Sequence, residues 1–328
     1  MTAQPGLKLV KRDASGVDLA FRADVLAGLA EAQKAIPARW FYDDAGSALF
    51  EDITQLPEYY PTRAETEILQ TRAAEIAGLI GPRRAVVEFG SGSSVKTPLL
   101  LSAIEPSAYV PLDIAGDFLR ASSAALAAKF PGLPVLPVEA DFMRRVELPA
   151  DVAHLPKLGF FPGSTIGNMI ARTATDLLRS MKDTLGDGAL LLIGLDLVKD
   201  EEVLLGAYDD ASGVTAQFNL NLLARINREL GGDVPIASFA HEARWNDPFA
   251  RIEMHLVARE SVSFTVSGQR FSMGAGESIH TENSHKFTKR SAQLLLAAGG
   301  WEPIARWTDE ARQFSLVLAE SGATRSAP

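Results

Sequence analysis

The chain has 328 residues, is 47% hydrophobic and 22% charged, and contains no cysteine, which is the profile of an ordinary globular protein and excludes disulfides and thiol catalysis. Its formal net charge of −9 argues against sequence-independent nucleic-acid binding, which needs a basic face. The five histidines show no H-E-x-x-H or comparable spacing, so we expect no metal site. No apolar run is long enough to span a membrane, and Met1–Gly16 lacks the apolar core of a secretory signal. We therefore expect a cytoplasmic enzyme.

The first patterned stretch joins a helix to an aromatic segment. Ala23–Ile36 is predicted to form the helix, and residues 37–69 follow it. Tyrosine and tryptophan offer an apolar face with a polar tip, which suits the wall of a small-ligand pocket. An aromatic mini-core beneath a loop explains the segment equally well. Thr62 and Glu65 are typical of a capping box for a helix over Arg63–Ile80. The aromatic residues are Trp40, Phe41, Tyr42, Phe50, Tyr59 and Tyr60.

The next stretch, RAVVEFGSGSSVKTP, predicts a nucleotide-type site. A valine-rich run, Ala85–Phe89, is typical of a buried strand, and a helical pattern begins at Lys96. Between them, Gly90 and Gly92 let the backbone turn sharply and let a ligand approach, while the helix start leaves N–H groups free. Asp113 ends the following apolar run and fits the acidic residue expected about 20 residues on, where it would hold ribose hydroxyls.

This motif alone has low specificity. The third glycine of a dinucleotide G-x-G-x-x-G is replaced by Val95, and no G-x-x-x-x-G-K-[ST] is present. Glu88, beside the turn, would repel a phosphate, so the turn suits a cationic or hydroxyl-rich ligand such as S-adenosylmethionine. The alternative is an ordinary glycine turn between a strand and a helix.

From here to Asp196 the pattern alternates strand and helix, which predicts a parallel, doubly wound α/β sheet. Ligands bind such sheets at the carboxyl ends of the strands, where Asp113, Asp141 and Pro162–Asn168 fall. Asp141 and Phe142 suit an adenine, with helix capping as the alternative for Asp141. The expected strands are Ala85–Phe89, Ala108–Leu112, Pro134–Val138, Leu158–Phe161 and Ala189–Gly194, and the expected helices are Lys96–Ile104, Ala115–Phe130 and Ala171–Leu185.

After Asp196 the pattern predicts a second lobe. Two helices lead into a half-buried strand and a hairpin across Ser267-Gly268, an antiparallel pattern foreign to a parallel sheet. A helix and two strands then complete the first domain, so we expect one domain over 61–196 with 287–328 and another over 8–60 with 197–286. The expected elements are helices Lys199–Tyr208, Val214–Leu230 and Ser291–Ala298, and strands Arg251–Ala258, Ser261–Val266, Gln269–Met273, Pro303–Thr308 and Gln313–Leu318.

Long strings in the chain resemble one family. They are FYDDAGSALFEDITQLPEYYPTRAE, VEFGSGSSVKT, FFPGSTIGN, GLDLVKD, AYDDASGVTAQFNLNLLARINRE and IHTENSHKF. Together they resemble the histidine-specific, S-adenosylmethionine-dependent methyltransferases of ergothioneine biosynthesis, from about Ala38 to Leu318. The resemblance implies a Rossmann-like class I methyltransferase sheet with a second, smaller α/β lobe that binds the substrate.

The resemblance also implies site residues. In the expected S-adenosylmethionine site, Gly90 and Lys96 match the positions that contact the methyl donor, and Asp113 matches the ribose ligand. Asp141 and Phe142 match the adenine site. The cofactor set also includes Glu88 and Gly92. For histidine, Asn168 and Tyr208 match the catalytic pair that orients the α-amino and carboxylate groups. The other expected substrate residues are Tyr42, Tyr59 (with Tyr60 the alternative), Met254, Glu282, Asn283 and Ser284, Glu282 and Ser284 reading the imidazole.

The function implied by the resemblance is trimethylation of the α-amino group of L-histidine to hercynine. We expect Glu282 to accept the imidazole N–H, with a solvated strand glutamate as the alternative. We expect a monomer with a small-molecule substrate and no nucleic-acid or membrane partner. The rival readings are a methyltransferase of the same fold that acts on another amino acid or small amine, a nicotinamide dehydrogenase, and a binding protein without catalysis.

Overall fold

The computed structural model describes residues 16–92, 96–114 and 116–322. Val95, the departure from the glycine pattern, and the first residue of the expected helix Ala115–Phe130 lie outside the described residues. The chain forms two compact units, each from two separate stretches of sequence. Unit 1 comprises Met1–Tyr60 and Lys199–His285, and unit 2 comprises Pro61–Val198 and Lys286–Pro328. Across the described ranges, no helix has both the length and the apolar character needed to cross a lipid bilayer.

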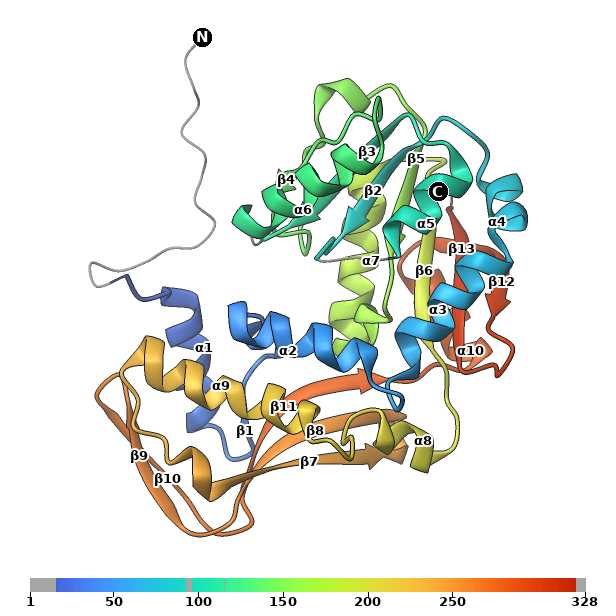
Figure 1. The fold of residues 1–328 in the computed structure, drawn as a ribbon. Helices are drawn as coiled ribbons and strands as arrows, with labels where there is room; N and C mark the ends of the chain where they lie inside the picture. The colour runs from blue at the N-terminus through green and yellow to red at the C-terminus, as the bar shows by residue number, and fades with distance from the viewer. Residues whose placement is uncertain (1–15, 93–95, 115, 323–328) are drawn as a thin grey trace, which may run out of the picture. The chain divides into compact units, whose positions relative to one another are not determined.

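Unit 2 contains a seven-stranded sheet in the order β12-β13-β6-β5-β2-β3-β4 (Figure 1). The strands from β6 to β4 run parallel, while β13 is antiparallel to both β6 and β12. The parallel, doubly wound sheet predicted from the sequence is therefore confirmed. The strands are β2 (Ala85–Phe89), β3 (Ala108–Asp113), β4 (Val138–Glu139), β5 (Lys157–Phe161), β6 (Leu190–Asp196), β12 (Trp301–Thr308) and β13 (Phe314–Ser321).

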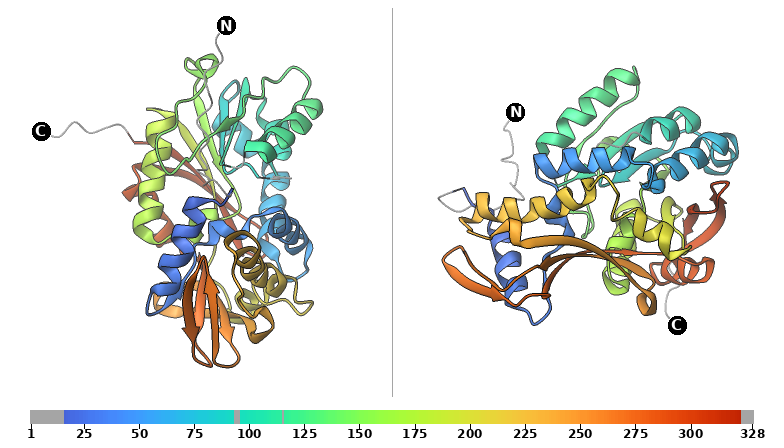
Figure 2. Two further views of the ribbon diagram at one scale, coloured as in Figure 1. Left: turned by 90° about the vertical axis from the view of Figure 1, so that its left-hand side faces the viewer. Right: turned by 60° about the horizontal axis from the view of Figure 1, so that its bottom comes forward.

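Helices cover both faces of this sheet, which explains why the central strands β2 and β6 are buried along their whole length and are mostly apolar. On one face, apolar side chains of α3 (Tyr60–Thr71), α4 (Ala73–Ile80) and α5 (Thr97–Ile104) form a core with the sheet. On the other face, α7 (Ala171–Leu185) and α10 (Lys289–Ala298) do the same (Figures 1 and 2). The helix α6 (Gly116–Lys129) follows β3, and η2 (Ala150–Val152) and η3 (Thr165–Asn168) are short turns of 3-10 helix.

Three expectations for unit 2 are wrong in detail. The strand expected over Pro134–Val138 is reduced to β4, because Pro134 and Pro137 have no N–H to donate to a ladder. The single helix expected over Arg63–Ile80 is two helices that meet at Arg72. The capping box is absent, because α3 already begins at Tyr60 and the Glu65 carboxylate binds other partners.

Unit 1 is built on a four-stranded sheet in the order β1-β11-β8-β7, with a separate hairpin of β9 and β10 (Figures 1 and 2). The strands are β1 (Lys34–Ala35), β7 (Phe239–Asn246), β8 (Arg251–Ala258), β9 (Val262–Val266), β10 (Gln269–Met273) and β11 (Ser278–His285). The helices are α1 (Leu19–Ala30), α2 (Asp44–Gln55), α8 (Glu201–Gly206) and α9 (Val214–Leu230), with η1 (Ala38–Phe41), η4 (Ile236–Ser238) and η5 (Asp247–Phe249).

Only part of the aromatic segment belongs to the core of unit 1. Phe41 is fully buried and packs against Phe218 of α9, with ring centroids 4.5 Å apart. Tyr42 and Tyr59, in contrast, are exposed and half-buried, respectively. The segment is therefore partly a core and partly a surface with polar tips. The sequence analysis missed α2, which lies within the aromatic segment, and β7.

Candidate active site

The glycine turn of unit 2 lies between the ends of two parallel strands. The N–H groups of Gly90 and Ser91 both donate to the carbonyl of Leu112, the penultimate residue of β3. The Gly92 N–H donates to Oδ2 of Asp113 at 3.3 Å. Gly90 and Gly92 have φ values of 73° and 37°, a region that glycine adopts without strain. Among the described residues, nothing lies within 4 Å of a Cβ built on Gly92, so the backbone there is open to a ligand.

Phe142 and Asp141 stand beside this turn. The Phe142 ring lies 3.5 Å from a Cβ built on Gly90, and it packs edge-on against Phe89 and Phe161. The exposed Asp141 accepts a hydrogen bond from the Met143 N–H at 3.0 Å, which closes a local turn and caps no helix. The expected adenine residue Phe142 is thus brought to the glycine turn, where two other aromatic rings pack against it.

Glu88 has buried hydroxyl partners. It is fully buried, and its carboxylate accepts hydrogen bonds from the Thr97 hydroxyl at 2.7 Å and the Tyr109 hydroxyl at 2.6 Å. Burial, and then the charge of Glu88, raise the pKa of Tyr109. Because Thr97 is the first residue of α5, Glu88 anchors the start of that helix.

Lys96 also has a protein partner. Its Nζ lies 2.5 Å from Oε2 of the buried Glu65, and the same oxygen accepts from the Gly163 N–H at 2.9 Å. This ion pair ties α3 and the start of α5 to the loop that follows β5. Asn168 ends the 3-10 turn η3 in that loop and is partly exposed.

Unit 1 brings together a second set of expected residues. The hydroxyls of Tyr208 and Ser284 are 2.6 Å apart, and either can donate. The Tyr59 ring lies 6.5 Å from that of Tyr208, in an edge-on arrangement. Met254 lies directly opposite Glu282 in the pairing of β8 with β11. Tyr60 is engaged elsewhere, because Lys199 Nζ donates to its hydroxyl at 2.6 Å and lies 4.2 Å from its ring centroid.

Tyr42 is electrostatically linked to Glu282. Burial raises the pKa of the Tyr42 hydroxyl, and the charges of Glu282, Tyr59 and Tyr208 raise it further. Tyr42 nevertheless keeps 45% of its surface exposed, so the shift reflects the depth of its hydroxyl and the nearby carboxylate rather than enclosure of the whole ring. A neutral phenol therefore stands near the Glu282 carboxylate.

Comparison with known proteins matches these features to a family. Residues 21–321 match the family model described as histidine-specific methyltransferase, SAM-dependent. The chain belongs to the S-adenosylmethionine-dependent, histidine-specific methyltransferases. Both the family and the methyl donor expected from the sequence are confirmed, and the dehydrogenase reading is wrong.

Named relatives agree with this assignment. The chain is 44% identical to the histidine N-alpha-methyltransferase of Mycolicibacterium smegmatis, over 92% of this chain and 94% of that protein. It is also 44% identical to the protein of that name from Mycobacterium tuberculosis, over 92% and 95% of the two chains. The ergothioneine biosynthesis protein 1 of Neurospora crassa is 29% identical over 84% of this chain and 32% of that protein.

A β-bulge sets which face of the unit 1 sheet carries the residues that were expected to bind histidine. Ile279 pairs with Leu256 in the core, but the register shifts between His280 and Glu282. Glu282 then pairs with Met254, which also faces the core. The extra residue is Thr281, and it moves Glu282 and Ser284 to the core face. Asn283 pairs with Glu253 on the opposite face and is not brought together with Glu282.

Asn219, in the middle of α9, holds this bulge. Its Oδ1 accepts from the Thr281 hydroxyl at 2.8 Å, and the Thr281 hydroxyl also lies 3.0 Å from the Met254 carbonyl. The Asn219 Nδ2 atom lies 2.8 Å from Nδ1 of His241. On the other side of the ring, His241 Nε2 lies 2.7 Å from the Tyr208 carbonyl oxygen. A carbonyl only accepts, so Nε2 carries the proton and Nδ1 accepts from Asn219. Burial lowers the pKa of His241, which keeps this imidazole neutral.

Sequence reasoning missed Asn219, His241 and Thr281. One signal was present: a strand with period two cannot place Ile279 in the core and Glu282 with Ser284 on that same face without an extra residue. The network therefore positions the backbone on which two of the expected histidine-binding residues, Tyr208 and Glu282, depend.

We expect Thr281→Val to impair histidine use while leaving the methyl donor bound normally. Valine keeps the shape of threonine but leaves the buried Asn219 oxygen without its donor, which costs about 1–3 kcal/mol. The kcat/KM for histidine should fall about tenfold or more, and calorimetry should show unchanged affinity for S-adenosylhomocysteine. Thr281→Ser, which keeps the hydroxyl, should restore most of the activity. Equal loss in the serine and valine variants would contradict this role.

Proposed function

We propose that this chain transfers three methyl groups from S-adenosylmethionine to the α-amino nitrogen of L-histidine, giving hercynine, a step of ergothioneine biosynthesis. The observation that carries this proposal is the family match across residues 21–321. The gathering of Glu282, Ser284 and Tyr208 on one face of the unit 1 sheet supports it. We also propose that it acts in the cytoplasm, as a monomer, on a small-molecule substrate.

We assign the methyl donor to unit 2 and recognition of the imidazole ring to unit 1. A nucleoside would fit the open backbone at Gly92, the Asp113 carboxylate at the same turn and the Phe142 ring beside it. Asp113 would hold the ribose diol and Asp141 the adenine amine. Glu88 and Lys96 would act indirectly, because Glu88 fixes the start of α5 and Lys96 pairs with Glu65.

Methyl transfer to an amine requires a neutral nitrogen with its lone pair aimed at the reacting carbon. S-adenosylmethionine supplies an electrophilic methyl group: a nitrogen–carbon bond forms while the sulfur–carbon bond breaks, and S-adenosylhomocysteine leaves. Asn168 and Tyr208 orient the amino and carboxylate groups, and such positioning can supply much of the rate. The first two transfers leave an N–H proton that water can remove, so no strong protein base is required. The third leaves a quaternary cation, which the faces of Tyr42 and Tyr59 stabilise.

Mass spectrometry of L-histidine incubated with the protein and S-adenosylmethionine tests the proposal. We expect a product three methyl groups heavier, from histidine alone among the amino acids, with N,N-dimethylhistidine accepted as a substrate. A monomethyl end product would refute the trimethylation. If the donor binds but histidine is not methylated, the pocket serves a different amine.

A further inference from the structure

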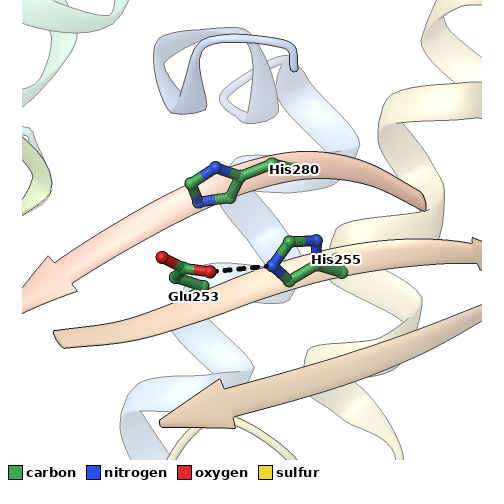
Figure 3. A group of neighbouring side chains, drawn as sticks. All are labelled: Glu253, His255 and His280. Atoms are coloured by element: carbon green, nitrogen blue, oxygen red, sulfur yellow. Dashed lines mark hydrogen bonds and ion pairs between the residues drawn. The ribbon is translucent and has the colours of Figure 1, made fainter. Parts of the chain in front are cut away.

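The outer face of the unit 1 sheet carries a cluster that the methyl-transfer proposal does not use. Glu253 and His255 lie on β8, His280 lies opposite His255 on β11, and all three face away from the core side where Glu282 lies (Figure 3). One donor atom from each residue lies within 4.8 Å of the other two. The two imidazole rings are stacked, with centroids 4.8 Å apart and an interplanar angle of 15°.

Outer hydrogen bonds already orient two of the donors. Arg251 and Asn246 both donate to Oε1 of Glu253, which leaves Oε2 turned toward Nε2 of His255 at 3.1 Å. Nδ1 of His255 lies 3.1 Å from the Ser278 hydroxyl. A bond at the second ring nitrogen is the usual way in which a metal-binding histidine is held.

Asn283 supplies an independent sign of a missing partner. It pairs with Glu253 across the two strands, on the same face of the sheet as the cluster. Its Oδ1 is nevertheless buried and has no hydrogen-bond partner among the described residues. A buried acceptor of this kind calls for a bound ligand, and a cation suits an oxygen beside a carboxylate.

We propose that Glu253, His255 and His280 bind a divalent transition-metal ion of the zinc class, with Asn283 Oδ1 as an additional oxygen ligand. Two imidazoles with oxygen donors favour Zn²⁺, Co²⁺ or Ni²⁺, whereas Mg²⁺ and Ca²⁺ prefer oxygen ligands alone. The sequence predicted no metal site, because the two histidines are 25 positions apart and meet only through the pairing of β8 with β11.

The donors must close slightly around the ion. Zinc–nitrogen bonds of about 2.1 Å place tetrahedral ligand atoms about 3.4 Å apart, so the widest gap narrows by about 1.4 Å at most. His280 is the residue placed to move, since it stands alone on β11 while the other two share β8. Its Nε2 now bonds the Glu282 carbonyl at 2.9 Å, so metal binding at that nitrogen would exchange this bond for the metal.

Isothermal titration of the tag-free, full-length protein with ZnCl₂ tests the site, and Co²⁺ absorption spectra report the ligand set. We expect one Zn²⁺ per chain with at least micromolar affinity, tetrahedral-type Co²⁺ bands, and no response to MgCl₂. His280→Gln should weaken Zn²⁺ binding at least about 30-fold, and Asn283→Ala about 10-fold. His154→Gln, which removes an exposed histidine of unit 2, should change neither readout.

The outcomes separate a metal site from a purely structural hydrogen-bond network. If His280→Gln is folded, with an unchanged melting temperature without metal, and still binds Zn²⁺ as tightly as the parent, the proposal is overturned. Should that variant unfold, Asn283→Ala and the Co²⁺ spectrum of the parent decide the question instead. Absence of stoichiometric Zn²⁺ binding to the parent would also overturn it. None of these readouts depends on methyl transfer, so failure here leaves the proposed function untouched.

Discussion

Glu282→Ala is expected to lower kcat/KM for L-histidine by about 10³-fold and to abolish most of the preference for histidine over phenylalanine. The carboxylate accepts the imidazole N–H in our proposal, and its loss leaves that substrate donor without a partner. Phenylalanine, which offers no ring N–H, should be used no worse by the variant than by the parent. The difference between the two substrates, rather than the loss of rate alone, is the signature of a residue that reads the imidazole.

Product formation from each amino acid, followed by mass spectrometry at saturating S-adenosylmethionine, gives the two specificity constants. Glu302→Gln removes an exposed strand carboxylate from unit 2 and is the matched control. Affinity for S-adenosylhomocysteine should be unchanged in both variants. Equal losses for histidine and phenylalanine in Glu282→Ala would mean that Glu282 holds the strand or the Tyr42 hydroxyl and does not select the substrate.

Local signals predicted the parts of the fold that are continuous in sequence. The strand Ala85–Phe89 and the helices α7 and α9 have the bounds expected, because each is an uninterrupted apolar or amphipathic pattern. The glycine turn and the acidic residue after the next strand also come together, since parallel neighbours end at the same sheet edge. Prolines shortened the strand β4, and a break at Arg72 divided one expected helix into α3 and α4. The apolar pattern of the sequence shows neither effect.

Features that depend on pairing between distant segments could not be predicted. Lys96, which was expected at the methyl donor, meets Glu65 only when α3 and the start of α5 are packed. Glu88 similarly turns into the interior because Thr97 and Tyr109 satisfy it there. The bulge at Thr281 puts Glu282 on the core face of the sheet and Asn283 on the opposite face. In each case the residue type suggested a functional role, but the residues that set its position lie on another helix or strand.

Asp113→Asn is expected to weaken binding of S-adenosylhomocysteine about 100-fold, with little loss of stability in the absence of ligand. Asparagine keeps an oxygen that can accept from the Gly92 N–H, so the turn itself should survive. It loses the negative charge and one of the two acceptors that a ribose diol requires, and hydrogen bonds to charged groups are worth about 1.5–3 kcal/mol each. Asp151→Asn, an exposed acidic residue in the same unit, should leave binding unchanged.

A thermodynamic cycle distinguishes a ribose contact from a merely structural role for Asp113. Calorimetry of the parent and Asp113→Asn with S-adenosylhomocysteine and with its 2′-deoxy or 3′-deoxy analogues gives the four binding free energies needed for each analogue. If the carboxylate binds the diol, removing a hydroxyl should cost the parent much more than the variant, because the variant has already lost the partner of that hydroxyl. If both proteins lose the same free energy on removal of either hydroxyl, Asp113 only shapes the glycine turn, and the ribose must be held by another residue of unit 2.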